Sequence, residues 1–103
     1  MHCMASSFTV VEHPAFKVFM AGLKDSVARA AIVGRVKRVQ AGNFGDWAPV
    51  GGEVNELRID VGAGWRVYYV RRGRIVVVLL TGGDKKTQDK DIRRARKLAV
   101  ELE

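Results

Sequence analysis

Residues 55–92 are NELRIDVGAGWRVYYVRRGRIVVVLLTGGDKKTQDKDI, and this stretch decides the fold. It holds three runs of strand-forming residues, separated by turns that glycine marks at residues 62–64 and at Gly73. We expect antiparallel strands over residues 53–61, 65–72 and 75–81. The start of the third run, residues 75–80, is apolar at every position, which predicts the central strand of the sheet, covered on both faces.

The first two runs alternate in polarity, so each strand has two different faces. The core-facing positions are Leu57, Ile59, Val61, Trp65, Val67 and Tyr69. The opposite face brings Arg58, Arg66 and Tyr68 together. Such a face is either an exposed working surface for an anionic ligand or the solvated side of an antiparallel sheet, and the pattern alone leaves both open.

The rest of the chain supplies helices that can cover the sheet. A short strand is expected over residues 8–12, followed by a helix over residues 14–23 that begins with a proline. A second helix is expected over residues 26–41, and a basic amphipathic helix begins near Thr87. The predicted class is α+β in the order β-α-α-β-β-β-α, an antiparallel meander with an N-terminal αα-hairpin packed on one face.

Residues 43–52 are expected to form a loop, because they are rich in glycine and contain Pro49. Phe44 and Trp47 lie in this loop. Two aromatic side chains there could stack on nucleic-acid bases or fold back to close the core, and in a domain of this size we favour the core.

Length and charge limit the possible functions. The chain has 103 residues, and we expect residues 1–103 to form a single domain. Eighteen Lys and Arg against eleven Asp and Glu give a net charge of +7. This charge favours partners with dense negative charge, above all nucleic acid or an acidic protein, although it can also serve only to prevent self-association.

Cys3 is the only cysteine, which excludes an intramolecular disulfide and a cysteine metal cluster and fits a reducing cytoplasm. No apolar run approaches the ~20 residues that cross a bilayer. The first residues lack the apolar core of a secretory signal, so no membrane partner is expected. Met4 is an alternative start, and residues 1–7 are expected to be disordered or to come from the vector or an alternative start.

The residues that could carry chemistry are cations. His2 and His13 have no partner at catalytic or ligand spacing, and residues 82–87, GGDKKT, lack the first glycine of a phosphate-binding loop. No zinc pattern occurs, and we expect neither a metal nor a cofactor. The candidate catalytic residues are Arg66, Lys85, Arg58 and Tyr68, and the candidate RNA-binding residues are Lys86, Arg71, Arg72 and Arg93.

Such a set of residues can promote RNA cleavage. A 2′-hydroxyl attacks the neighbouring phosphate, and Arg and Lys stabilise the extra charge of the pentavalent transition state. Ordinary Lys and Tyr have pKa values near ~10, so they are poor general bases at neutral pH. A catalyst of this composition would depend on another macromolecule to arrange its substrate.

The segments ELRIDVGAGWRVYYV, VVVLL and GGDKKTQDKDI, followed by a basic helix, resemble the RelE/ParE superfamily of bacterial toxins. Within it the chain is similar to the HigB-like branch of addiction-module killer proteins, which is related to phage Gp49-type proteins. The resemblance covers residues 8–102. It implies a RelE-like fold and a toxin that a co-transcribed antitoxin neutralises. In RelE-like and HigB-like members it also implies an endoribonuclease that cuts mRNA in the ribosomal A site.

The resemblance also assigns roles to residues. Arg66 stands where the superfamily carries a catalytic or phosphate-binding arginine, Arg58 matches a basic position of the preceding strand, and Lys85 matches a catalytic cation after the last strand. Two positions depart from RelE itself: Glu56 stands in place of a lysine, and Asp91 lies near the place of its C-terminal tyrosine. The implied catalytic set is therefore not that of RelE.

Three classes of function remain open. The favoured one is a ribosome-dependent mRNA endonuclease, with the ribosome and mRNA as partners. The second is a ParE-like inhibitor of DNA gyrase, and the third is an inactive homologue that serves only as antitoxin partner. In each case we expect a cognate antitoxin from the adjacent gene, of helix-turn-helix type for the favoured class. Operator DNA would be bound only through the toxin–antitoxin complex.

Overall fold

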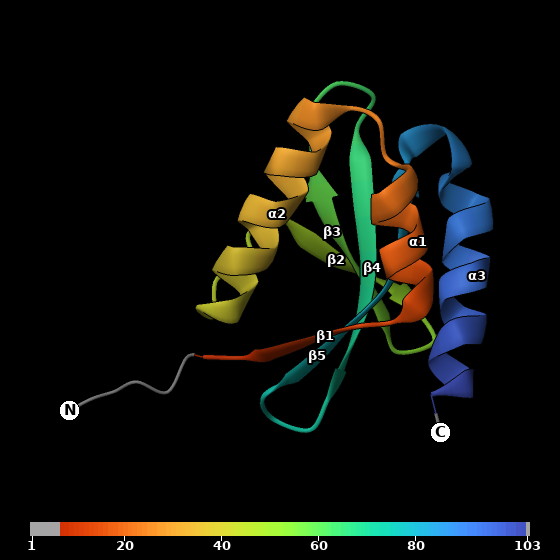
Figure 1. Ribbon diagram of the computed structural model, residues 1–103. Coiled ribbons are helices and arrows are strands. Elements are labelled where there is room, and N and C mark those ends of the chain that lie inside the picture. Colours follow the sequence, from red (N-terminus) through yellow and green to blue (C-terminus); the bar gives the residue numbers. More distant parts are fainter. Residues whose placement is uncertain (1–6, 103) are drawn as a thin grey trace.

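The computed structural model describes residues 7–102. Within them a five-stranded sheet lies between two helices on one face and a third helix on the other, which confirms the predicted α+β class (Figure 1). The elements are β1 (Thr9–Glu12), α1 (Pro14–Gly22), α2 (Ser26–Gln40), β2 (Trp47–Gly51), β3 (Val54–Ile59), β4 (Trp65–Arg72), β5 (Val76–Asp84) and α3 (Gln88–Glu101), with a 3₁₀ turn at Lys85–Thr87. The predictions about His2, Cys3 and Met4 concern residues outside this range.

The strands lie in the order β1-β5-β4-β3-β2. Strands β2 to β5 form the expected antiparallel meander, whereas β1 pairs with β5 in parallel, Val10 opposite Val77. Strand β5 is covered on both faces, as predicted for residues 75–80, and lies inside the sheet between β1 and β4. It is not the central strand, because β2 extends the sheet beyond β3 and so puts β4 in the middle. The side chains of β5 alternate between the two cores: Val77 and Leu79 pack on one face and Val78 and Leu80 on the other.

The prediction of a loop over residues 43–52 is wrong for the second half of this segment. Residues 47–51 form β2, which pairs with the outer edge of β3 and has a bulge between Pro49 and Gly51. A proline without an N–H is tolerated there because β2 is an edge strand. Gly52 and Glu53, with φ of 60° and 68°, form a two-residue turn that joins β2 to β3. The order is therefore β-α-α-β-β-β-β-α.

The αα-hairpin covers one face of the sheet, as predicted. Phe16 of α1 and Ile32 and Val39 of α2 are buried against the apolar face of β3 and β4. Phe44 also joins this core, whereas Trp47 is 44% exposed on the edge strand. The expectation that both loop aromatics close the core is thus confirmed for Phe44 and wrong for Trp47.

Helix α3 packs on the opposite face, where Ala95 and Ala99 are buried against the sheet. Two glycines at the end of β5 let the helices approach. A Cβ on Gly82 would lie 2.5 Å from the Phe19 ring of α1, and a Cβ on Gly83 would collide with Asp91 of α3. The glycine pair therefore allows close packing on both faces, and it brings the start of α3 beside the ends of β3 and β4.

Candidate functional site

Three of the four candidate catalytic residues gather at one end of the sheet. Arg58 of β3 and Arg66 of β4 are direct cross-strand partners. Lys85 follows the end of β5, and its backbone N–H donates to the Gly64 carbonyl at 2.7 Å, just before Arg66 in the chain. We refer to Arg58, Arg66 and Lys85 as the cation cluster.

The face that carries this cluster is not an open surface, which corrects the sequence-based expectation. The side chain of Arg58 is 39% exposed, but that of Arg66 is only 9% exposed, and Tyr68 is fully buried. The reason is α3, whose apolar side packs on this face and covers β4. Arg58 and Lys85 are therefore the members of the cluster that a ligand can reach.

A buried glutamate connects the arginines to α3. The Glu56 side chain is 3% exposed, and its Oε2 accepts a hydrogen bond from Nε of Arg58 at 2.9 Å. Its Oε1 accepts a hydrogen bond from Nε2 of Gln88 at 2.9 Å and lies 4.0 Å from Nε of Arg66. The hydrogen bond from Arg58 to Glu56 raises the pKa of that guanidinium, so Arg58 stays charged.

Two further carboxylates surround the arginines. Nη1 of Arg66 lies 3.6 Å from Oδ1 of Asp60 and donates to the Trp65 carbonyl at 3.0 Å. Nη1 of Arg58 lies 3.6 Å from Oδ1 of Asp46. Because both aspartates are exposed, these pairs are weak, and at the accessible Arg58 a phosphate could replace Asp46.

Tyr68 is the candidate that the structure separates from solvent. Its hydroxyl is buried, and among the described residues it has no hydrogen-bond partner. Burial raises the pKa of the Tyr68 phenol, and the negative charge of Glu56 raises it further. A phenol in this state does not lose its proton near neutral pH, so it is unsuited to act as a general base.

Beyond the cluster, the start of α3 carries more cations. A shallow polar depression is lined there by Lys85, Lys86, Thr87, Gln88, Asp89, Lys90 and Arg93. The backbone N–H groups of Lys86 and Thr87 are already bound by Oδ1 of Asp84, at 2.9 and 3.3 Å. An anion in this depression would therefore be held by the lysine and arginine side chains rather than by the helix end. The depression adjoins the cluster through Gln88, which contacts Glu56.

The other two candidate RNA-binding residues lie elsewhere. Arg71 and Arg72 end β4, five and six residues beyond Arg66, which at about 3.3 Å per residue puts them roughly 16 and roughly 20 Å from it along the strand. The Arg71 guanidinium stacks on the Phe44 ring, 4.3 Å from its centroid. Arg72 donates to Glu53 at 2.8 Å and to the carbonyl of Ala99, at the end of α3, at 3.2 Å. Both arginines have structural partners, and the fold does not bring them to the cation cluster.

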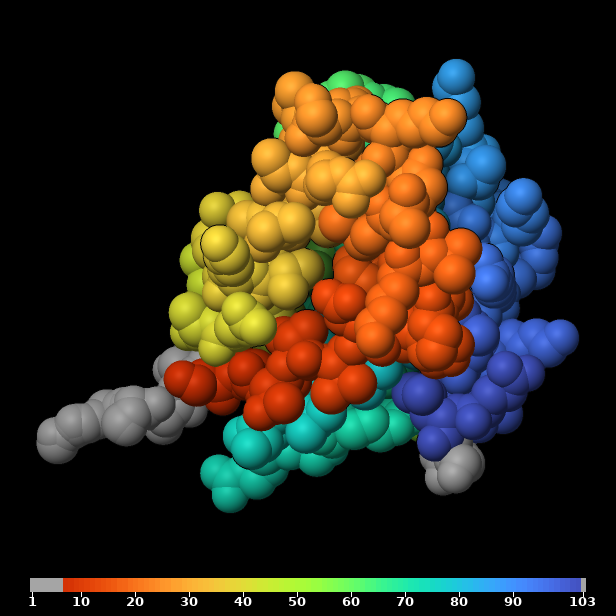
Figure 2. All heavy atoms as spheres, viewed as in Figure 1, coloured from red at the N-terminus to blue at the C-terminus, as the bar shows by residue number. Residues whose placement is uncertain are grey.

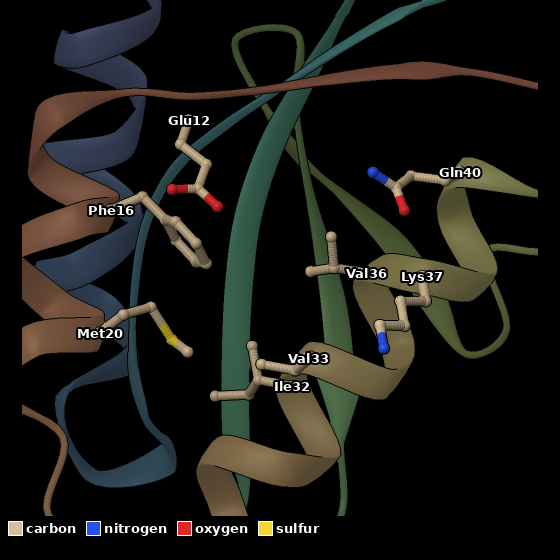
Figure 3. A pocket seen from close by; sticks show the side chains of 8 residues that line it. All are labelled: Glu12, Phe16, Met20, Ile32, Val33, Val36, Lys37 and Gln40. Carbon is tan, nitrogen blue, oxygen red and sulfur yellow. The ribbon is translucent and has the colours of Figure 1, made fainter.

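A second concavity lies on the opposite side of the sheet. Figure 2 shows a hollow between α1 and α2, and Figure 3 shows the apolar side chains of Phe16, Met20, Ile32 and Val36 facing into it. Its volume is about 300 Å³, and Glu12, Lys37 and Gln40 lie at its rim. The hollow contains none of the candidate site residues, so the cation cluster and this groove are separate features.

Sequence reasoning missed two members of the site. Glu56 and Gln88 were not proposed as functional residues, although Glu56 and Arg58 are two positions apart and must share a face of β3. That spacing was the available signal for a carboxylate beside the arginines. No sequence pattern, however, indicates that Gln88 would reach Glu56 from α3, because the contact spans 32 residues.

The remaining histidine within the described residues has a structural role. His13 caps α1, where its Nδ1 accepts the N–H of Ala15 at 2.9 Å. Among residues 7–102, no His, Cys, Asp and Glu side chains gather into a group of three that could hold a metal ion. In the same range, no helix combines the length and the apolar character needed to span a bilayer.

Comparison with known proteins identifies the family. A family model described as phage-derived protein Gp49-like matches residues 19–100, from α1 to near the end of α3. The chain belongs to the Gp49-like family. This family is related to the RelE- and HigB-like toxins, as the sequence resemblance implied. An uncharacterised protein from Haemophilus influenzae is 51% identical over 87 residues, which is 84% of this chain and 88% of that protein.

Proposed function

We propose that this Gp49-like protein is the toxin of a toxin–antitoxin pair and that it cleaves mRNA on the ribosome. The observation that carries the proposal is the cross-strand pair of Arg58 and Arg66 with Lys85 beside it. Cations at fixed positions are what a phosphoryl transfer with a charged, pentavalent transition state requires. The family membership supports the toxin assignment, and the HigB-like nuclease activity is the more specific part of the proposal.

In this mechanism the RNA itself supplies the nucleophile. The 2′-oxygen attacks the adjacent phosphorus while the bond to the 5′-oxygen breaks, which leaves a 2′,3′-cyclic phosphate and a free 5′-hydroxyl. Arg58, whose outer nitrogens are exposed, would bind the non-bridging oxygens as a fork. Lys85 would stabilise the charge that develops on the phosphate or on the leaving oxygen. Arg66 is largely buried beside Arg58, so it would add positive potential at the phosphate without contacting it.

Proton transfer is the step to which these residues contribute least. The buried phenol of Tyr68 is unsuited as the base. Histidine is absent from residues 14–102, so the usual proton carrier is missing from the cluster. We therefore propose that the ribosome orients the 2′-hydroxyl for attack and that the protein is a weak nuclease on free RNA.

The partner implied by a toxin is an antitoxin. An unneutralised toxin would stop the growth of its own host, so we propose a cognate antitoxin that is encoded by the adjacent gene and is of helix-turn-helix type. The toxin would reach operator DNA only as part of that complex. Co-expression with the neighbouring gene is expected to relieve growth arrest.

The test compares two arginines of the same chain. Arg58→Ala removes the exposed arginine of the cluster, and Arg74→Ala removes an exposed arginine from the turn at the other end of the β4–β5 hairpin. Induction of the natural chain should arrest growth and produce cuts in translated mRNA, visible by primer extension. Loss of one preorganised donor should reduce cleavage by Arg58→Ala roughly a hundredfold to a thousandfold. Arg74→Ala should cleave like the natural chain.

Three outcomes would count against the proposal. Growth arrest with intact mRNA and gyrase-linked DNA breaks would assign the ParE-like activity instead. Expression without any effect on growth would indicate a homologue that acts only through its antitoxin. Equal cleavage by Arg58→Ala and by the natural chain would move the active site away from the cation cluster.

A further inference from the structure

Glu56 is a buried carboxylate with three nitrogen atoms around it, from Arg58, Arg66 and Gln88. We infer that Glu56 is the positioning residue of the proposed nuclease site: it fixes the Arg58 guanidinium for phosphate binding and ties that arginine to the start of α3. The inference rests on the proposed function only where it concerns RNA cleavage. The fixed position of Arg58 can be measured without any activity.

The first step concerns charge. Arg58 and Arg66 occupy facing positions on β3 and β4, and like charges placed directly opposite each other destabilise a sheet. A buried anion on the same face removes this repulsion, and Glu56, two residues before Arg58, occupies that place. Burying a carboxylate is costly unless it is paired and hydrogen-bonded. Both oxygens of Glu56 accept a hydrogen bond, so the carboxylate is held in one orientation.

The second step concerns which nitrogen is bound. Glu56 accepts from Nε, the nitrogen nearest the Arg58 backbone, at 2.9 Å. The outer edge of the guanidinium therefore keeps its donors for another acceptor, and its nearest carboxylate there is the exposed Asp46, 3.6 Å from Nη1. A long arginine side chain that is already fixed loses less conformational entropy when it binds a phosphate. Glu56 thus prepares Arg58 without occupying the edge that a phosphate would use.

The third step concerns α3. Gln88 is the first residue of this helix, and its amide donates to the second oxygen of Glu56. Two of the three lysines of the polar depression, Lys86 and Lys90, flank Gln88 in the sequence. One carboxylate therefore connects the arginine on the sheet to the helix start that carries these lysines. If this connection were lost, the distance between the two groups of cations would no longer be fixed.

The experiment uses Glu56→Gln, which keeps the shape and removes the charge. The matched control is Glu53→Gln, which removes a carboxylate that pairs with Arg72 at 2.8 Å near the other end of the sheet. The mobility of each arginine side chain, as distinct from that of the backbone, is measured by ¹⁵N relaxation of the arginine Nε–H groups in the purified protein. Cleavage of ribosome-bound mRNA is measured in single turnovers at saturating protein, in the natural chain, Glu56→Gln, Arg58→Ala and the double variant.

We expect the Arg58 Nε–H to be rigid in the natural chain and in Glu53→Gln, and mobile in Glu56→Gln. The exposed Arg74 serves as a mobile reference in every sample. Cleavage by Glu56→Gln should fall about tenfold to a hundredfold, which is the usual effect of a misplaced group. Because Glu56 acts through Arg58, adding Glu56→Gln to Arg58→Ala should cause little further loss, whereas two independent defects would multiply.

Other results separate the two proposals. An Arg58 Nε–H as mobile as that of Arg74 in the natural chain overturns the positioning role, even if Glu56→Gln does not fold. Multiplying losses in the double variant overturn it as well, because they assign Glu56 a separate structural role. If the natural chain cleaves no RNA but Arg58 is rigid and loosens in Glu56→Gln, the nuclease assignment fails and the positioning of Arg58 by Glu56 stands.

Discussion

The two arginines of the cluster are neighbours, yet they differ in what a substitution would do. Arg66 has a 9% exposed side chain and lies against Glu56, whereas the Arg58 guanidinium reaches solvent. Arg66→Ala would remove the cation whose Nε lies 4.0 Å from the buried Glu56 carboxylate, and a substitution that weakens a buried charge network typically costs about 0.5–3 kcal/mol. We expect this loss in the free energy of unfolding, measured with urea. Arg74→Ala should change it by less than about 0.5 kcal/mol. Equal stability of Arg66→Ala and the natural chain would contradict the buried pairing.

The tyrosines of β4 make a prediction about alkaline pH. Burial raises the pKa of Tyr69 to about 12, and burial shifts that of Tyr68 in the same direction. In the unfolded chain both phenols ionise near pH ~10. Above pH ~10 the folded protein keeps protons that the unfolded chain has lost. The two tyrosines therefore leave the free energy of unfolding unchanged below pH ~10, and above it they lower that free energy by up to about 1.4 kcal/mol per pH unit for each tyrosine.

Tyrosinate absorbance checks this prediction, because the chain has only these two tyrosines. The absorbance should stay low above pH ~10 while the protein is folded and rise together with unfolding. In Tyr69→Phe the alkaline loss of stability should become shallower, and the lost hydroxyl should cost little because it has no hydrogen-bond partner among residues 7–102. A tyrosinate signal near the ordinary pKa in folded protein would show that the phenols reach water.

For individual residues, the sequence predicted which side chains share a face of the sheet, but not which of them a helix would bury. Alternation placed Arg58, Arg66 and Tyr68 on one side, and this is confirmed. It did not reveal that α3 would bury Arg66 and Tyr68, because the face on which a helix packs depends on contacts between distant segments. Arg71 and Arg72 were grouped with the site from charge alone. Their distance from it follows from the length of β4, which the sequence did predict.

At the scale of elements, the Gly82–Gly83 pair controls how closely two helices pack. Gly82→Ala would place a methyl group against the ring of Phe19, which also packs against Trp65 with ring centroids 6.2 Å apart. Overpacking of this kind costs about 1–3 kcal/mol of folding free energy. Gly34→Ala is the matched control, since nothing lies within 4 Å of a Cβ there and alanine favours the helix interior. That control should gain roughly 0.5–1 kcal/mol. Thermal unfolding of both variants measures the difference, and a Gly82→Ala protein as stable as the natural chain would contradict the tight packing.

The elements themselves were predictable where their pattern was strong. The helices and the three strands β3, β4 and β5 follow from apolar periodicity and lie within a few residues of their predicted bounds. Strand β2 was missed because Pro49 and three glycines within residues 45–52 outweighed the few strand-forming residues between them. An edge strand can carry such residues, since one side of its backbone needs no partner. The adjacent Gly51 and Gly52 were the hairpin signal that could have revealed it.

At the scale of the whole molecule, positive charge lies on both sides of the sheet. Helix α2 carries Arg29, Arg35, Lys37 and Arg38 and no acidic residue, and it covers the face opposite α3. The cation cluster, in contrast, is nearly balanced by Glu56, Asp60 and Asp46. Net charge therefore cannot say which side meets the ribosome, although it predicts that association weakens with salt. The proposed site requires the side that carries the start of α3.

Paired charge removals on the two faces test this orientation. Lys86→Gln with Lys90→Gln removes two of the four cations that line the polar depression beside the cluster, and Lys37→Gln with Arg38→Gln removes an exposed pair of cations from α2. If ribosomal RNA or mRNA contacts the α3 side, the first double variant should bind ribosomes more weakly. Its slope of log affinity against log salt should fall by about one for each lysine that contacts a phosphate. The α2 variant should keep the natural slope, because its charges face away from the RNA. Binding measured over a salt series distinguishes the two. A reduced slope for the α2 variant alone would mean that the α1–α2 side docks on the ribosome, and the cation cluster could not then be at the scissile phosphate.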